Sequence, residues 1–282
     1  MLRIRLALLF ITLCVSAGVS AEDETLKPFV LAEVTGGTLD QVQQQVESKL
    51  TGGGFEIVGK VRPYEGAAIV VVTSPALKKN AAQSEFGGYG AVQRVSITKA
   101  FNTEGGADQF QIAYTNPTYM AHAYRMSDDL SAVTERLGKV LGAEGVFGSD
   151  KGLTARQLRK YHYMFGMEYF TDYSDHLLAE HHNHTLAVKA VESNLAQHLG
   201  GVSKVYRVDI PGKNEVLFGV DMDQTPTGDK YSSDDYIMSI IDFKDIRSTP
   251  HLPVEILVSD NKVYALYYRF RIAMNFPDLS MM

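Results

Sequence analysis

The sequence predicts an α+β protein made of two tandem copies of one unit, each a curved antiparallel sheet packed on a long helix. The first supporting observation is that strand patterns come in runs joined by short turns, which disfavours parallel βαβ folds. The second is internal similarity, since residues 110–125 resemble residues 255–270 at an offset of 145. Each stretch reads as an apolar strand, a polar turn containing Asn-x-x-Tyr, and an aromatic strand.

Two further blocks share this offset. Residues 46–50 (Val-Glu-Ser-Lys-Leu) match residues 191–195 (Val-Glu-Ser-Asn-Leu), and residues 92–101 match residues 237–246. Three blocks in one order at one spacing indicate a duplicated domain. We therefore expect a first β-α-β(4)-α repeat at 22–148, a linker with a bridging helix at 149–170, and a second repeat at 171–282.

The elements of the first copy follow from periodicity and turn residues. A strand at 28–35 precedes Thr38, which is suited to cap a helix. Val42, Val46 and Leu50 then recur at helical spacing, and a run of three glycines at 52–54 ends the helix. Further strands are expected at 55–62, 67–73, 92–101, 109–115 and 120–124, and further helices at 75–82 and 128–141.

The second copy is expected to repeat this order. A bridging helix at 155–164, with Leu158, Tyr161 and Phe165 on one face, joins the halves. A strand at 174–180 leads to a helix at 184–198 capped by Asn183. The remaining strands are expected at 203–210, 216–221, 236–243, 254–259 and 262–272.

The first 21 residues have the pattern of a secretory signal peptide. Arg3 and Arg5 precede an apolar run at 6–15, and Val-Ser-Ala at 19–21 forms a small-residue cleavage site. The alternative is an uncleaved membrane anchor, although the run is shorter than the ~20 residues needed to span a bilayer. No second apolar run approaches that length. We therefore expect a periplasmic or secreted protein with no membrane span after cleavage.

The segment 50–64 combines the end of the first helix, the glycine run and the strand Gly-Phe-Glu-Ile-Val-Gly. Together with the strand pair around Asn116, it resembles the bacterial domain-of-unknown-function family numbered 302. The resemblance covers most of the first half and, more weakly, the second. It implies an α+β fold similar to that of the TATA-box-binding protein, in agreement with the order above. Because the family has no established reaction, the resemblance transfers no functional residue.

Composition excludes several kinds of chemistry. Cys14, the one cysteine, lies in the signal peptide, so the mature chain is expected to have no disulfides, thiolate metal sites or cysteine nucleophiles. The formal net charge of -6, without a basic stripe, makes the chain a poor nucleic-acid binder. No Gly-x-Ser-x-Gly nucleophile motif occurs. No catalytic residue is marked, and we expect a role in binding.

A turn rich in histidine is the sharpest local feature. Glu180, His181, His182 and His184 supply a carboxylate and imidazoles, which suit Zn²⁺, Cu²⁺ or Ni²⁺. The alternative is a solvated polar loop. His162, among tyrosines, could be an axial haem ligand, or a helix residue packed between the halves.

A calcium loop is a weaker interpretation of residues 221–229. Asp221, Asp223 and Asp229 alternate as in an EF-hand, but Pro226 replaces the glycine at the sharp turn and Ser232 stands where the bidentate glutamate is expected. The EF-hand assignment therefore fails. A looser Ca²⁺ site and a solvated loop remain as alternatives.

The abundant tyrosines indicate where a small ligand could bind. On alternate positions of a strand they line either a core or the wall of a cavity. We expect a ligand between sheet and helix near Tyr119 and Tyr264, or at the seam between the halves near Tyr161. The expected function is non-enzymatic binding of a small ligand or an envelope protein. The alternative is a metal- or haem-binding envelope protein that uses the histidine turn.

Overall fold

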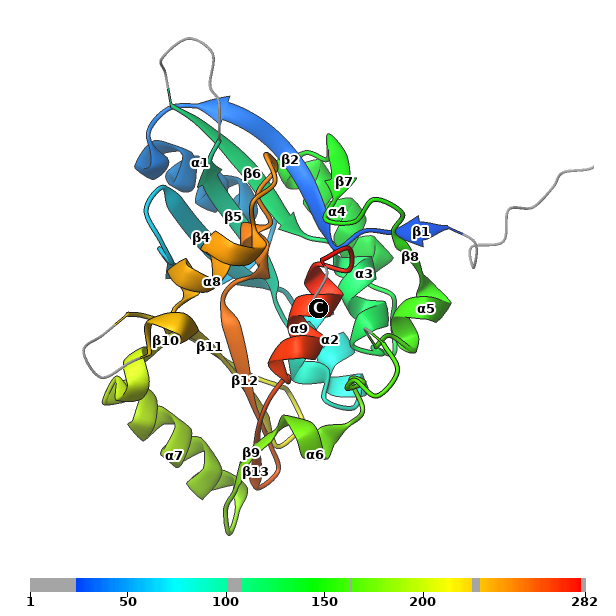
Figure 1. Cartoon of the computed structure of the whole chain (residues 1–282), viewed down its shortest axis with the longest axis vertical. Helices are drawn as coiled ribbons and strands as arrows, with labels where there is room; N and C mark the ends of the chain where they lie inside the picture. The colour runs from blue at the N-terminus through cyan, green and yellow to red at the C-terminus, as the bar shows by residue number, and fades with distance from the viewer. Residues whose placement is uncertain (1–23, 101–107, 163, 225–228, 280–282) are drawn as a thin grey trace, which may run out of the picture.

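The computed structural model describes residues 24–100, 108–162, 164–224 and 229–279, so the expected signal peptide lies outside the described residues. The α+β class is confirmed, because helices pack on two large antiparallel sheets and a small two-stranded one (Figure 1). Within the described ranges, no helix combines the length and apolar character needed to cross a bilayer.

The first large sheet has the strand order β3-β4-β5-β6-β2-β7, with every neighbouring pair antiparallel. The helix α1 (Leu39–Gly52) packs on β3, β4 and β5, and its N-terminus is fixed by a capping box between Thr38 and Gln41. Its stripe of Val42, Val46 and Leu50 is fully buried, as the spacing predicts. The strands are β2 (Phe29–Gly36), β3 (Glu56–Val61), β4 (Ala67–Thr73), β5 (Gln93–Lys99), β6 (Gln109–Thr115) and β7 (Gly145–Phe147).

The second large sheet has the order β10-β11-β12-β13-β9, again antiparallel throughout. In both sheets the strand before the long helix pairs with the last strand of the series, and the strand after the helix lies at the opposite edge. The long helix here is α7 (His184–Ala196), capped by Asn183 as predicted. The strands are β9 (Leu177–Glu180), β10 (Val202–Asp209), β11 (Glu215–Met222), β12 (Val254–Ser259) and β13 (Lys262–Ala265).

Shorter elements connect and cover these sheets. β1 (Thr25–Leu26) pairs with β8 (Leu153–Thr154). The first half also contains α2 (Pro75–Gln83), the 3-10 helix η1 (Gly87–Gly90), α3 (Pro117–Ala123), α4 (Ser131–Leu141) and α5 (Ala155–Arg159). The second contains α6 (Tyr173–His176), η2 (Leu199–Gly201), η3 (Lys230–Ser232), α8 (Asp234–Ile241), η4 (Thr249–His251) and α9 (Tyr268–Asn275).

Three expected strands are wrong in whole or in part because helices form there, and local helix-start signals explain the first two. Residues 120–124 lie in and just after α3, since Asn116 caps that helix and Pro117 suits its first turn. Residues 236–241 belong to α8, where Ser233 is the N-cap and two aspartates occupy the first turn. The expected strand to residue 272 ends at Ala265, and α9 follows.

These helices change how the halves align. The stretch 110–125 is a strand followed by a helix, whereas 255–270 contains two strands and the start of α9. The proposed match of 92–101 with 237–246 sets strand β5 against helix α8, so that match is wrong. The match of 46–50 with 191–195 does pair residues of α1 and α7. The bridging helix is also shorter than expected, since α5 ends at Arg159.

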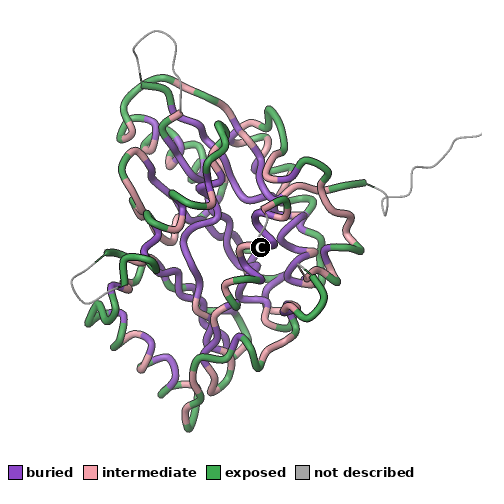
Figure 2. Tube along the Cα trace, in the orientation of Figure 1, coloured by how far each residue is buried: buried purple, intermediate pink, exposed green. Residues whose placement is uncertain are grey.

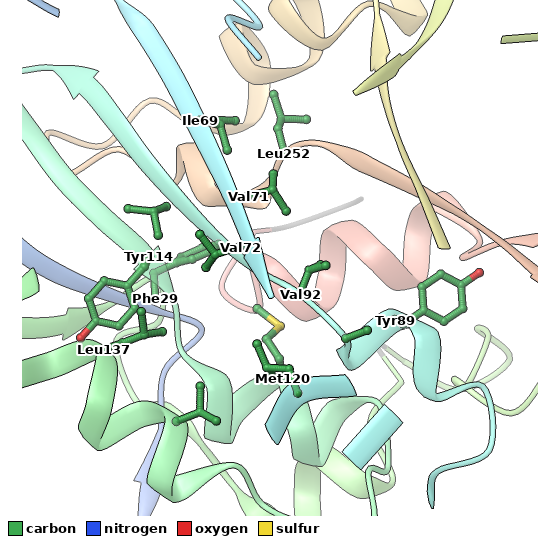
Figure 3. Close-up of a cluster of buried hydrophobic side chains, with 14 of the residues drawn as sticks. Phe29, Ile69, Val71, Val72, Tyr89, Val92, Tyr114, Met120, Leu137 and Leu252 are labelled. Atoms are coloured by element: carbon green, nitrogen blue, oxygen red, sulfur yellow. The ribbon is translucent and has the colours of Figure 1, made fainter. Parts of the chain in front are cut away.

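The two sheets meet at a seam that each half helps to fill. The segment η1 packs on β11 and β12, and η4 packs on β4, β5 and β6. One hydrophobic core therefore runs through both halves, and the buried chain continues from one sheet to the other in Figure 2. Figure 3 shows this core with Leu252, which follows η4, near Ile69 and Val71 of β4.

A buried ion pair crosses the same seam. Arg94 of β5 donates from Nη1 to Oε1 of Glu255 on β12 at 2.9 Å, and the two side chains are 4% and 2% exposed. The Tyr206 hydroxyl donates to the same oxygen at 3.3 Å. Because the charges are paired inside the protein, they fix how β5 and β12 face each other.

Candidate ligand pocket

Tyr119 and Tyr161 lie together at the end of α9. The Tyr119 hydroxyl donates to the Met274 carbonyl oxygen at 2.7 Å, and the Tyr161 hydroxyl donates to that of Ala273 at 2.8 Å. Tyr119 is completely buried, and burial raises its pKa well above the ordinary value. Both tyrosines therefore hold α9 against the first half. Tyr161 also lines a surface hollow of about 630 Å³ beside α5.

Tyr264 occupies a different environment on β13. Its ring packs edge-on against Phe86 at a centroid distance of 4.8 Å, and Phe86 in turn stacks on Tyr173 at 4.0 Å. Burial raises the pKa of Tyr264 as well. Tyr264 lines neither the hollow beside Tyr161 nor the hollow beside the histidine turn.

The histidine turn lies between β9 and α7. Glu180, His181 and His182 line an open hollow of about 750 Å³, whereas His184 is the first residue of α7 and its Nδ1 bonds the Asp260 carbonyl at 2.8 Å. Among the described residues, no group of three or more His, Cys, Asp or Glu side chains is placed to hold a metal ion. Metal binding at this turn stays a prediction that loading experiments can test.

His162 lies after α5 and outside the helix expected to contain it. Its Nδ1 bonds the backbone oxygen of Met164 at 2.8 Å, and its ring packs on Tyr169 at a centroid distance of 4.4 Å. One ring nitrogen is thus already in contact with the chain.

A more enclosed and more apolar pocket of about 460 Å³ lies where three segments converge. One is the connection from β7 to β8, another is the segment after α8, and the third is the chain after α9. The apolar wall is formed by Ile241, Phe243, Phe276 and Leu279. The volume and the lining are those of a site for a small organic molecule.

Residues of the first sheet hold the segment after α8 in place. Gln111 of β6 uses both ends of its amide, since Nε2 donates to the Asp245 carbonyl at 2.7 Å and Oε1 accepts from the Arg247 N–H at 2.9 Å. Asp242 accepts from the Ser248 N–H at 2.8 Å and from Arg247 Nε at 2.9 Å. Burial raises the pKa of Asp242. These bonds join the pocket wall to the first sheet and to itself.

The third wall is fixed by a carboxylate near the end of the described chain. Asp278 accepts from the Ser149 hydroxyl at 3.1 Å and from the Asp150 N–H at 2.6 Å, so it joins the β7–β8 connection to the segment after α9. Phe276 is packed against Phe29 of the first half at a centroid distance of 6.4 Å. This side of the pocket is therefore also preformed.

The polar groups at the pocket are mainly acidic. Asp150, Asp242 and Asp278 line it together with one amine, that of Lys244. Asp242 and Asp278 already accept hydrogen bonds from the protein, whereas Asp150 is mostly exposed and its carboxylate lies 3.6 Å from Lys244 Nζ. Because Lys244 pairs with Asp150 and Arg247 pairs with Asp242, the three carboxylates leave a net excess of one negative charge, which favours a neutral or cationic ligand group over an anion.

Sequence reasoning missed this pocket because its residues are widely separated and form no motif. The only local signal was an apolar pair, Phe243 and Ile246, in a polar segment; both are exposed, Phe243 to 67%. Comparison of the chain with protein-family models, curated proteins and solved structures finds no match.

Proposed function

We propose that the chain is an exported, non-enzymatic binding module that holds a small amphipathic molecule in the pocket lined by Ile241, Phe243, Phe276 and Leu279. The observation that carries this proposal is the preformed apolar cavity of about 460 Å³ at the junction of three segments. Export is supported by the signal-peptide pattern of residues 1–21. We also propose that the chain is related to the family numbered 302, on the resemblance of residues 50–64 and of the segment around Asn116.

The ligand chemistry follows from the pocket wall. Its apolar part would bury a hydrocarbon or aromatic body, at about 25 cal/mol for each Å² removed from water. At the mouth, the carboxylate of Asp150 offers an acceptor, and Asp278 adds a further carboxylate nearby. We therefore expect a ligand with an apolar body and a cationic or hydrogen-bond-donating head.

We also propose that the two sheets derive from one duplicated unit. Support comes from the shared order of strands around α1 and α7 and from the similar short segments η1 and η4, each of which packs on the opposite sheet. Further support comes from one irregularity in each edge strand that follows the long helix, at Val58 in β3 and Val205 in β10. A shared unit explains why the seam is built from matching elements.

The test compares two ligands that share an unbranched alkyl chain and carry head groups of opposite charge. Decylamine and decanoate are titrated into the protein in a calorimeter at neutral pH. The amine is expected to bind at least about tenfold more tightly, which corresponds to 1.4 kcal/mol. Phe243→Ala should weaken amine binding, and Phe165→Ala is the matched control, because Phe165 is 99% exposed and does not line the pocket.

Two results would reject this proposal. One is equal loss of binding in both phenylalanine variants, which would indicate non-specific adsorption. The other is absence of binding by either ligand while circular dichroism shows a folded protein.

A further inference from the structure

The outer face of the first sheet is covered by two helices. Besides α1, it carries α4, which packs against α1 and β2 and buries a stripe of Val133, Leu137 and Leu141. The fit between the helices is close, because a side chain at Gly53 would collide with Val140 at 2.4 Å. Arg136 Nε donates to the Gly53 carbonyl at 2.7 Å and fixes the junction.

The outer face of the second sheet carries α7, which contacts β10, β12 and β13. In the described part of the chain, the short 3-10 helix η2, which follows α7 directly, packs beside it, but no long helix makes extensive contact with it as α4 does with α1. The strand β9 has β13 as its one described strand neighbour. The difference is visible in Figure 1, where α7 stands at the margin of the molecule. Val188, Val191 and Leu195 of α7 are buried, but at 8%, 6% and 7% exposure they are less completely covered than the apolar stripe of α1, at 0%.

A groove lies where a second helix would be. It has a volume of about 320 Å³ between α7 and the strands β9, β12 and β13, and its apolar lining is Leu178, Ala179, Ala190, Val191, Leu195, Ile256 and Val263. At His181 and Ala190 it continues into the hollow of about 750 Å³ beside the histidine turn. Two leucines on this surface are strongly exposed, Leu178 to 61% and Leu186 to 43%.

We propose that this groove binds an amphipathic helix of a partner protein. The chain itself indicates the kind of occupant, since α4 fills the corresponding place beside α1 with an apolar stripe at i, i+4 and i+8. The two receiving helices also match, with Val46 and Leu50 in α1 and Val191 and Leu195 in α7. A helix in an apolar groove is a common mode of recognition, with anchors one turn apart.

Exposure of these apolar side chains to water is unfavourable, which favours a partner that covers them. The exposed Leu178 lines the groove and the exposed Leu186 lines the hollow that adjoins it, where Glu180 and Lys189 are also found. Charges of both signs at the rim favour a partner helix whose polar face carries both signs, as α4 does with Glu135 and Lys139. The inference does not depend on the pocket near Phe243.

The test places a photoreactive benzoylphenylalanine at position 178 of the full chain, in the cells that naturally produce it. Irradiation should link this position to one protein, and mass spectrometry should place the link in a helix with apolar residues at i and i+4. The control carries the same group at position 34, since Val34 on the first sheet is 44% exposed and does not line the groove. Position 34 should not give that product.

Variants decide whether the groove is responsible. Ala190→Arg fills it and Leu186→Asp makes its edge polar, and each should lower the yield of the product at least about tenfold. Ile240→Asp on α8, another exposed apolar position, should leave the yield unchanged. Circular dichroism confirms that each variant is folded.

Three outcomes would overturn the proposal. They are links only to a second copy of this chain, links only to lipid, and a product whose yield the groove variants do not change. Failure here leaves the ligand titrations unaffected, because those depend on Phe243.

Discussion

Replacing Glu255 with alanine would leave the Arg94 guanidinium charged and buried between the two sheets. The pair is joined at 2.9 Å, and with side chains 4% and 2% exposed, water has little access to replace the lost partner. Removal of one member of such a pair costs about 3–5 kcal/mol, because the remaining charge is uncompensated. The Tyr206 hydroxyl loses its acceptor as well.

Replacing both members tests whether the cost arises from the stranded charge. With Arg94→Met and Glu255→Leu together, we expect a stability at least about 1–2 kcal/mol above that of Glu255→Ala, since apolar residues of similar volume can replace a buried pair and only the Tyr206 hydroxyl still lacks its acceptor. Urea unfolding at neutral pH, followed by circular dichroism, gives the free energy of unfolding of each variant and the coupling energy of the pair.

A surface pair provides the comparison. Arg207 and Glu192 are joined at 2.7 Å, but their side chains are 34% and 38% exposed, so Glu192→Ala should cost no more than about 1 kcal/mol. A Glu255→Ala variant no less stable than Glu192→Ala would refute the reasoning. So would a double variant as unstable as the Glu255→Ala single one, because the loss could not then come from an unpaired charge.

Three further predictions concern separate features of the fold. Burial, with help from Asp221, raises the pKa of Asp234 to about 7, so the folded protein keeps this carboxyl protonated while the unfolded chain releases the proton near pH 4. The resulting stabilisation is present below about pH 4 and is lost as the pH rises to about 7; Asp234→Asn should flatten this fall, by up to about 4 kcal/mol, in unfolding curves measured from pH 4 to pH 8. Gly219→Ala places a methyl group 1.9 Å from the Tyr206 ring and should destabilise by at least about 1–3 kcal/mol in the same assay, whereas Gly52→Ala at the end of α1, where the added methyl meets no atom within 4 Å, should cost less. If the turn at 180–184 binds Zn²⁺ or Cu²⁺, elemental analysis after loading will find stoichiometric metal that disappears when its three histidines are changed to alanine, and equal metal content in both proteins would exclude the site.

The sequence predicted the fold class and most elements of the first half, because they depend on local signals. The stripe of Val42, Val46 and Leu50, the cap at Thr38 and the glycines after the helix all act within a few residues, and each gave the observed structure. The strands β3 to β6 likewise alternate with clear turn residues. Local consistency of this kind is what single-sequence reasoning can detect.

The errors have a common physical cause. The apolar residues of α8 and the aromatic ones around α9 have strand-like composition, and only Ser233 and the two aspartates after it signalled the start of α8. α9 has no capping side chain at Tyr267, so its position depends on tertiary contacts such as the hydrogen bonds from Tyr119 and Tyr161. Contacts across more than one hundred residues leave no pattern in a local window.

Both proposed sites lie where the two halves differ. One half has a longer connection than the other, and one half has a helix that the other lacks in the described chain. If α2 with η1 and α8 with η4 are counterparts, the connection from Gln83 to Gly87 is shorter than that from Ile241 to Thr249. The additional residues include Phe243 and Lys244, which form the pocket wall, and the amide of Gln111 fixes them. The groove has the opposite origin, since the second sheet lacks the counterpart of α4 in the described chain. Elements present in both halves fill the seam and stabilise the fold, so an insertion and an omission are the changes that can create binding surfaces without loss of the core.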